Sequence, residues 1–273
     1  MPKNAQNAEI LHRLHAGPKP LLLANAWDAG SARVVEEAGA AAIATSSAAM
    51  AWSAGYADDE RLPVAELLAG CTRIARVVKL PLTVDIERGY GSSAPEVGRL
   101  GDALIDLGAV GVNIEDGQAA DGPRRLSERI AALREAAARA GVRFFVNARC
   151  DVYLGPAADA ATRFDEVLRR ARLYIEAGAD GIFVPGLGQI ADIARLAGAI
   201  GGKPLNVYAG YAGAPTVEAL SAAGVRRISL GCGPLQAAYG LLGRIARQMS
   251  EQGRYDEMAA VMRPTAELNR LFD

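Results

Sequence analysis

Eight short apolar segments alternate with helix-forming segments along this chain, and this alternation restricts the folds open to it. The apolar segments are continuously hydrophobic rather than alternating, as expected for strands of a sheet that helices cover. Strands are expected at residues 20–25, 41–45, 81–87, 110–114, 143–149, 181–184, 204–208 and 225–230. Eight strand–helix units favour a (β/α)8 barrel over an open, doubly wound sheet.

The helical segments give no sign of a second domain. Helices are expected at residues 5–16, 28–38, 63–78, 95–107, 127–140, 162–177, 189–199, 216–223 and from 234 onward, and a loop at 46–60. After the first strand the chain reads NAWDAGSARV, which lacks the glycine fingerprint of dinucleotide-binding folds. We expect one barrel domain over residues 1–273, with the barrel at about 19–250 and a C-terminal helical extension at about 251–273 that packs on a neighbouring subunit.

Composition argues against several classes of partner. The formal net charge of −1 and an aromatic content of 5% provide no basic, aromatic surface for nucleic acid. No apolar run approaches the roughly 20 residues that span a bilayer. The three cysteines are widely spaced and odd in number, which favours free thiols and a location in the reducing cytoplasm.

Polar residues are concentrated where the predicted strands end. In a barrel of this kind the active site lies at the C-terminal ends of the strands, so these residues are candidate site residues. They include Asn25, Trp27, Thr45, Ser46, Ser47, Asp85, Glu87, Asn113, Glu115, Asp116, Asn147, Arg149, Asp151, Asn206, Tyr208 and Ser229. Those on the second to fifth strands form the densest group.

Three acids in this group, Asp85, Glu87 and Glu115, are positioned to share one cation. Oxygen ligands without histidine or thiolate suit Mg²⁺ or Mn²⁺. Alternatively, Glu87 and Glu115 form a structural network of ion pairs with Arg88 or Arg149. The guanidinium of Arg149 also offers a planar fork for a substrate carboxylate.

The residues that are missing from the strand ends narrow the chemistry. His12 and His15 both lie on the N-terminal helix, where we expect them to be solvated, so a Ser-His-Asp triad or a histidine-bound metal is excluded. No lysine follows a strand, which excludes a Schiff-base mechanism. Metal-assisted polarisation of an oxo or hydroxy acid remains.

Several of these segments together resemble the isocitrate lyase/phosphoenolpyruvate mutase superfamily. The matching stretches are ANAWDAGSARVVEEAGAAAIATSSA, GYADDE, TVDIERGYG, GVNIEDG, VNARCD, AGADGIFVPG and PLNV. The resemblance implies a barrel whose last helix is exchanged within a homodimer, usually in a homotetramer. It also implies Mg²⁺ near Asp85, Glu87 and Glu115, a 2-oxo acid held by Ser46, Ser47 and Ala48, a carboxylate on Arg149, and Asp58 on a mobile gating loop.

The chain also departs from well-known members of that superfamily. Lyases that cleave isocitrate or methylisocitrate carry a Lys-Lys-Cys-Gly-His segment after the fourth strand, where this chain reads GQAADGPRRLSE. The phosphonate-acting mutases carry a Trp, an Asn and a His that are absent here. The Trp position is Ala44, the Asn position falls within 117–122, which has no Asn, and the His position is Pro185. Cys150 follows the fifth strand and is expected to be a buried thiol rather than a replacement acid.

The leading hypothesis is a Mg²⁺-dependent lyase that cleaves a C–C bond in a small 2-oxo or 2-hydroxy di- or tricarboxylate. The substrate would be an oxaloacetate-, methylisocitrate- or alkylmalate-like acid, and the reaction would pass through a metal-stabilised enolate. Asp58, Asp85, Glu115 and Arg149 would be catalytic. Alternatives are a phosphonopyruvate- or phosphoenolpyruvate-acting enzyme, a barrel that binds a 2-oxo acid with little turnover, and a phosphate seat at residues 231–233.

Overall fold

A ring of eight parallel strands forms the centre of the computed structural model, which describes residues 3–156 and 159–273. Neighbouring strands follow the order β1-β8-β7-β6-β5-β4-β3-β2. The strands are β1 (Leu21–Leu23), β2 (Ile43–Ala44), β3 (Leu82–Asp85), β4 (Ala109–Glu115), β5 (Phe145–Arg149), β6 (Gly181–Phe183), β7 (Leu205–Tyr208) and β8 (Arg227–Ser229). A parallel bridge between Ala26 and Thr45 joins the two ends of the sheet, which makes it a nearly closed (β/α)8 barrel, as predicted.

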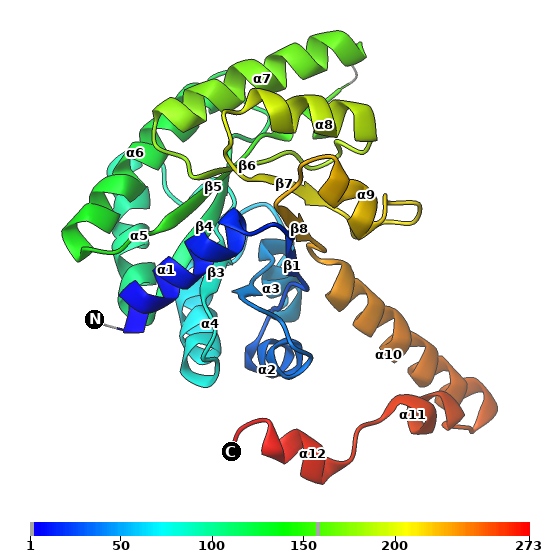
Figure 1. Ribbon diagram of the computed structural model, residues 1–273. Helices are drawn as coiled ribbons and strands as arrows, with labels where there is room; N and C mark the ends of the chain where they lie inside the picture. Colours follow the sequence, from blue (N-terminus) through cyan, green and yellow to red (C-terminus); the bar gives the residue numbers. More distant parts are fainter. Residues whose placement is uncertain (1–2, 157–158) are drawn as a thin grey trace.

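Helices connect the strands and surround the ring (Figure 1). They are α2 (Ala29–Glu37), α3 (Ser47–Ser53), α4 (Val64–Val77), α5 (Ala94–Leu107), α6 (Gly122–Ala140), α7 (Ala160–Glu176), α8 (Ile190–Ala199) and α9 (Val217–Ala222), with a short 3-10 turn at Asp151–Leu154. Local sequence sets their ends: Asp28 forms a capping box at the start of α2, and Gly108 ends α5 in the left-handed conformation. Within the described ranges, no helix is both long and apolar enough to cross a membrane.

The segment 46–60, predicted to be a loop, begins with a helix instead. Ser46 accepts a hydrogen bond from the backbone N–H of Ala49 and so caps α3. The small residues from Ser47 to Ala51 are buried, and alanine has the highest intrinsic helix propensity. The small residues were interpreted as typical of a loop, but they form a helix that packs close to the barrel.

Helix α1 (Lys3–Ala16) covers the N-terminal end of the barrel. Its residues Ala8 and Leu11 are buried against Phe145 and other inward-facing strand residues. The expectation that His15 is solvated is wrong: its ring is 3% exposed and stacks on Phe145 at a centroid distance of 3.9 Å. Burial lowers the pKa of His15 to about 3, so the imidazole is neutral at physiological pH. Because α1 closes this end, the opposite end is the one open to ligands.

The C-terminal helices leave the barrel instead of covering it. Figure 1 shows α10 (Gly233–Gln252) projecting away from β8, followed by α11 (Asp256–Val261) and α12 (Thr265–Arg270), which returns beneath α2. Arg263 pairs with Glu37 of α2 at 2.8 Å. Large apolar side chains are exposed along this arm, and Leu242 and Met249 of α10 are 60% and 61% exposed. On the barrel itself, Leu22 of β1 is 49% exposed.

The close packing of α1, β4 and β5 generates a stability prediction. A Cβ added to Gly111 would lie 2.8 Å from the carbonyl oxygen of Phe145 and 3.1 Å from the side chain of Leu11. We expect Gly111→Ala to lower the free energy of unfolding in urea by about 1–3 kcal/mol, because backbone cannot move away cheaply. Gly198, an exposed residue of α8 with nothing within 4 Å of an added Cβ, is the matched control, and Gly198→Ala should stabilise by roughly 0.5–1 kcal/mol. Equal stability of the two variants would contradict this packing.

Candidate active site

A cavity of about 850 Å³ opens at the C-terminal mouth of the barrel, opposite α1. Residues from the ends of β1, β2, β3, β4, β5, β6, β7 and β8 reach it, together with the 3-10 turn and the first turn of α7. Its lining consists of Asn25, Ser46, Ser47, Ala48, Asp58, Asp85, Asn113, Arg149, Tyr153, Leu154, Arg163, Phe183, Pro185, Gly186, Leu187, Gly188, Gln189, Tyr208, Tyr211, Gly213, Ser229, Gly231 and Cys232. This composition combines two acids and two arginines with an apolar, aromatic wall.

Asp85, the last residue of β3, is fixed by its neighbours on β2 and α3. Its Oδ2 accepts hydrogen bonds from the backbone N–H of Ser47 at 3.1 Å and from the Ser47 hydroxyl at 2.9 Å. Its own N–H donates to Oγ1 of Thr45 at 2.9 Å. Hydrogen bonds to a charged group contribute about 1.5–3 kcal/mol each, enough to hold one rotamer. The other carboxylate oxygen, Oδ1, accepts no hydrogen bond from the described residues and is available to a ligand.

Arg149, at the end of β5, is held between two acids. Its guanidinium lies 2.7 Å from Glu115 and donates to both carboxylate oxygens of Asp151, at 2.6 Å through Nε and at 3.2 Å through Nη2. Burial opposes the charge, but Glu115 and Asp151 together raise the pKa of Arg149 above its usual value. The arginine is therefore a permanently charged group of fixed orientation.

Asp116 supports this pair from behind. Its Oδ1 accepts the backbone N–H of Asp151 at 2.9 Å, and its Oδ2 accepts from Arg170 at 2.8 Å and from the hydroxyl of Tyr174. Because Asp116 is 4% exposed and fully hydrogen-bonded, it fixes the turn that carries Asp151. The orientation of Arg149 thus depends on residues outside the cavity.

Glu87 lies behind the cavity, not in its lining. The chain leaves the extended conformation after Asp85, and Glu87 adopts a left-handed φ of 47°, which ends the period-two alternation on which its prediction relied. Its carboxylate accepts hydrogen bonds from the N–H of Glu60 and the hydroxyl of Tyr90, both at 2.6 Å. Burial raises the pKa of Glu87 to about 7.

The predicted metal ligands Asp85, Glu87 and Glu115 are not in contact, but they are close enough for the charges of Asp85 and Glu87 to raise the pKa of Glu115. Burial raises the pKa of Glu115; the ion pair with Arg149 opposes this, and the charges of Asp85 and Glu87 add to the increase. No group of three acid, histidine or cysteine side chains gathers closely enough for direct metal binding in the described part of the chain. Of these three acids, Asp85 alone lines the cavity with a free carboxylate oxygen, so a divalent cation held there would keep most of its water, as Mg²⁺ commonly does.

The loop that carries Asp58 is docked over this end of the cavity. Arg88 anchors it by ion pairs with Asp59 at 2.7 Å and Glu60 at 3.1 Å. Asp59 and Glu60 both adopt left-handed φ angles, 79° and 56°, in the turn. Asp58 reaches the lining, where burial and the charge of Asp85 raise its pKa. The loop is thus held by charge pairs at its far end, with Asp58 facing the cavity.

The predicted site residues fall into three groups. Those in the lining are Ser46, Ser47, Ala48, Asp58, Asp85, Asn113 and Arg149. Thr45, Glu87 and Glu115 stand directly behind the lining and bond to it or to its supports. Asn206 is fully buried and accepts a hydrogen bond from Ser229 at 3.3 Å, and Trp27 packs half-buried against the core.

Residues that the sequence analysis missed complete the cavity, chiefly Tyr153, Arg163, Phe183, Leu187 and Tyr211. Phe183 is the last residue of β6 and could have been found by reading every strand end regardless of polarity. Arg163 lies in the first turn of α7, and Tyr153 lies in the 3-10 turn. No strand-end pattern points to these two, because they depend on how the β5–α7 connection folds.

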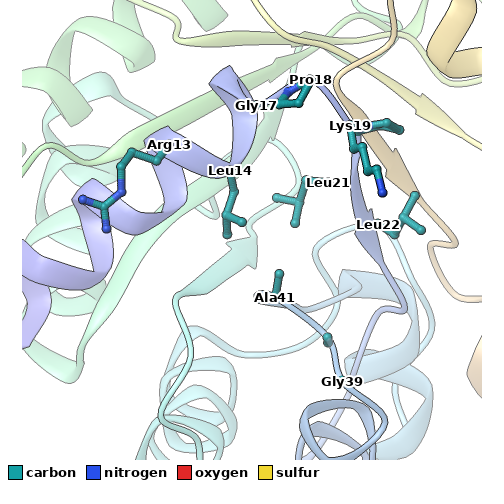
Figure 2. Close-up of a pocket in the computed structure, with 11 residues that line it drawn as sticks. Arg13, Leu14, Gly17, Pro18, Lys19, Leu21, Leu22, Gly39 and Ala41 are labelled. Atoms are coloured by element: carbon teal, nitrogen blue, oxygen red, sulfur yellow. The ribbon is translucent and has the colours of Figure 1, made fainter.

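A second cavity lies at the closed end of the barrel and carries none of this chemistry. It measures about 430 Å³ and lies between the end of α1, β1 and the turn before β2 (Figure 2). Its lining has two cations, Arg13 and Lys19, and otherwise apolar side chains and glycines. Because it has no acid and lies at the N-terminal end of the strands, we do not assign it to the active site.

All three cysteines are free thiols. Cys71 and Cys150 are buried, and burial raises the pKa of Cys71 to about 12, so neither is a nucleophile. The prediction of a buried thiol at Cys150 is confirmed. Cys232, the N-cap residue of α10, is partly exposed in the cavity lining, and burial raises its pKa as well.

The sequence matches the phosphoenolpyruvate phosphomutase family over residues 11–250. An uncharacterised protein of Mycobacterium tuberculosis is 32% identical over 88% of this chain and 88% of its own length. The 2-methylisocitrate lyase of Escherichia coli is 32% identical over 66% of this chain and 62% of that enzyme. An oxaloacetate decarboxylase of Bradyrhizobium is 30% identical over 72% of this chain and 71% of that enzyme.

Solved structures agree with the sequence comparison. A putative phosphonomutase from Burkholderia cenocepacia has a TM-score of 0.84 and 41% identity and covers 90% of this chain and 99% of its own. A putative lyase/mutase from the same organism has a TM-score of 0.89 and 33% identity over 100% and 97% of the two chains. The chain belongs to the phosphoenolpyruvate phosphomutase family, within the isocitrate lyase/phosphoenolpyruvate mutase superfamily that its strand-end motifs resemble.

Proposed function

We propose that this protein is a Mg²⁺-dependent lyase that cleaves a C–C bond in a small 2-oxo or 2-hydroxy di- or tricarboxylate. Membership of the superfamily, together with the names of the methylisocitrate lyase and oxaloacetate decarboxylase relatives, supports an enzyme of the carbon–carbon lyase type. The observation that carries the proposal is the pairing, in one cavity, of a fixed carboxylate on Asp85 with a fixed guanidinium on Arg149.

The side chains suit the charges that such a reaction develops. Cleavage next to an oxo group leaves an enolate, whose oxygen needs a positive partner. Arg149 keeps two N–H donors beyond the three committed to Glu115 and Asp151, and these can orient a substrate oxygen. Ala48 lies in the first turn of α3, where its backbone N–H lacks a helical partner and can hold a substrate carboxylate, whereas the N–H of Ser47 already donates to Asp85. Asp58 reaches the cavity from the loop that covers it.

In this proposal the metal is held by Asp85, with Glu87 and Glu115 reached through water. The free Oδ1 of Asp85 and the mutual repulsion of the three acids support this arrangement. Bound Mg²⁺, or Mn²⁺, would polarise the oxo group and offset the developing negative charge. The free thiols fit the reducing cytoplasm as the location.

The second candidate is an enzyme that acts on phosphonopyruvate or phosphoenolpyruvate. The 41% identity to a putative phosphonomutase and the family match favour it. Against it, the 117–122 segment reads GQAADG and has no basic side chain for a phosphonate. Release of inorganic phosphate from phosphonopyruvate by the purified protein would favour this candidate over the lyase.

Activity provides the first test. We expect the protein with Mg²⁺ to turn over oxaloacetate or a substituted malate, and Asp85→Ala to lower kcat/KM by about 10²-fold or more, because the metal and enolate lose their fixed partner. Asp102→Ala, which removes an acid paired with Arg139 on the outer surface, should leave kcat/KM within about twofold. Equal turnover by Asp85→Ala and wild type would refute the role of Asp85.

The raised pKa of Glu87 provides a second test, on stability. The pKa of Glu87 is about 7 in the folded protein and near 4.5 in the unfolded chain. Its contribution to the free energy of unfolding is therefore largest below pH 4.5 and is lost as the pH rises through 7. In EDTA, Glu87→Gln should therefore gain stability relative to wild type between pH 5 and 8, by about 1–3 kcal/mol in urea unfolding. Mg²⁺ should reduce the pH dependence of wild type, because the cation favours the ionised form.

The surface variant Glu128→Gln is the control for that experiment, since Glu128 is half exposed and, in the part of the chain that the structure describes, forms its ion pair with Arg124. Its stability should follow wild type at every pH. If Glu87→Gln also follows wild type, Glu87 does not titrate in this range. If Mg²⁺ leaves the wild-type curve unchanged, Glu87 does not contribute to a metal site.

We extend the proposal to assembly: the protein forms a homodimer by exchange of α10, and pairs of dimers form a homotetramer. The apolar side chains along α10–α12 and the uncovered Leu22 on β1 support this, because each offers a surface that the other could cover. A stable single chain would be expected to fold α10 against β8 and β1 instead. Exchange also completes the barrel's ring of helices.

Light scattering coupled to size exclusion tests the assembly. We expect an even-numbered oligomer for wild type and a shift to smaller species for Leu242→Asp, because a charge would be buried in the interface at a cost of several kcal/mol. Arg247→Asp, an exposed change on a different side of α10, should keep the wild-type mass. A monomeric wild-type protein would rule out the exchange.

A further inference from the structure

The two arginines that line the active-site cavity differ in how their charge is balanced. Arg149 has Glu115 and Asp151 within 2.7 Å, so two carboxylates already compensate its one charge. Arg163 has no carboxylate within 4.0 Å among residues 3–156 and 159–273. The other ionised side chains in the lining, Asp58 and Asp85, are negative. Arg163 is therefore the group in this cavity with an uncompensated positive charge, which an anionic ligand would neutralise.

The position of Arg163 is set by the start of α7 and by a contact with Tyr153. The residue lies in the first turn of α7, whose N-cap Asp159 accepts the N–H of Thr162 at 2.9 Å. The guanidinium lies 5.7 Å from the ring centroid of Tyr153, a cation–π contact that orients it. Its Nε and the hydroxyl of Tyr153 are both buried without a hydrogen-bond partner in the described structure. Both are therefore donors that no described protein group satisfies, and they belong to side chains that line the cavity.

An apolar stretch of lining accompanies the two cations. Phe183, Leu154 and Leu187 contribute to this wall, and the Arg149 guanidinium lies 6.0 Å from the Phe183 ring. The volume of about 850 Å³ is near the upper end of the roughly 300–1,000 Å³ typical of sites for drug-sized ligands. A four-carbon acid bound at Asp85 would leave much of this volume unfilled. It would also leave Arg163 without an anionic partner.

We propose that Arg163 is a specificity-determining residue that binds the distal carboxylate of a substrate longer than four carbons. This rests on the proposed lyase function and identifies its substrate class: 2-oxo or 2-hydroxy dicarboxylates whose reacting end lies at Asp85 and whose apolar chain runs along Phe183 and Leu187. The hydroxyl of Tyr153 donates a second hydrogen bond to the same carboxylate. Arg149, already neutralised, orients the reacting end.

Calorimetric binding separates this subsite from catalysis. The full-length protein is titrated with 2-oxo dicarboxylates of four, five and six carbons and with 2-oxo monocarboxylates of the same lengths. We expect a five- or six-carbon diacid to bind about tenfold or more tightly than the matching monoacid, and Arg163→Gln to abolish that difference, because one ion pair of this kind is worth about a factor of ten. Monoacid binding should change by less than about twofold.

Two further variants control the experiment. Arg163→Lys keeps the charge and should retain part of the preference for the diacid, which a merely structural role for Arg163 would not predict. Arg172→Gln removes an exposed arginine of the same helix and should bind as wild type does. A phosphonate of the same chain length forms a third ligand series, and tighter binding of it than of the diacid would overturn the carboxylate assignment.

The outcomes distinguish this proposal from the lyase function. If Arg163→Gln keeps the wild-type preference for diacids, or if the four-carbon diacid binds best, the subsite assignment is wrong even when turnover is observed. If the preference for longer diacids depends on Arg163 while no acid is cleaved, the subsite is supported and the lyase proposal fails.

Discussion

The ion pairs of Arg149 with Glu115 and Asp151 determine the charge of the whole cavity mouth. They join β4 to β5 and the turn behind it, and Asp116 in turn fixes that turn through Arg170 and Tyr174. Removing one member of a buried pair costs roughly 3–5 kcal/mol, so these contacts strongly favour the observed arrangement. Two acids on one arginine leave a surplus negative charge, to which Asp85 and Glu87 add. Binding of a cation or a proton at the inner end of the cavity would therefore neutralise part of this negative charge.

A cation on the other side of the floor partly offsets this surplus. Arg227 of β8 is fully buried inside the barrel and donates to Oδ1 of Asn113, which also accepts from Asn147 at 2.9 Å. Burial lowers its pKa to about 10, and the charge of Asp85 opposes that change. No acid contacts Arg227 within residues 3–156 and 159–273, so its charge acts through the electrostatic field it imposes on the floor. Arg227 is thus a fixed cation beneath the acids of the mouth, and the proposed metal ion would be a second cation near them.

How far the sequence predicts this molecule differs between the barrel and the site. Continuous apolar runs and the polar residues after them were sufficient to place eight strands and the lining residues Ser47, Asp85, Asn113 and Arg149, because a parallel barrel brings all strand ends to one face. The period-two alternation used for Glu87 ends after Asp85, since the backbone turns into a left-handed conformation that alternation cannot reveal. The interpretation of the strand ends missed α3 and Arg163, whose positions follow from packing of the connections and not from strand periodicity.

The contrast between Arg149 and Arg163 shows how one barrel can separate chemistry from selectivity. Groups on strand ends are rigid, mutually compensated and close to the closed interior, so they suit the reacting atoms, whose geometry tolerates little error. Arg163 comes from a helix that follows a connecting segment, and its single aromatic contact leaves its charge uncompensated. Substitutions in that connection can therefore change which acid is accepted without disturbing Asp85 or Arg149. The β5–α7 connection, rather than the strand ends, is where the choice of substrate is expected to reside.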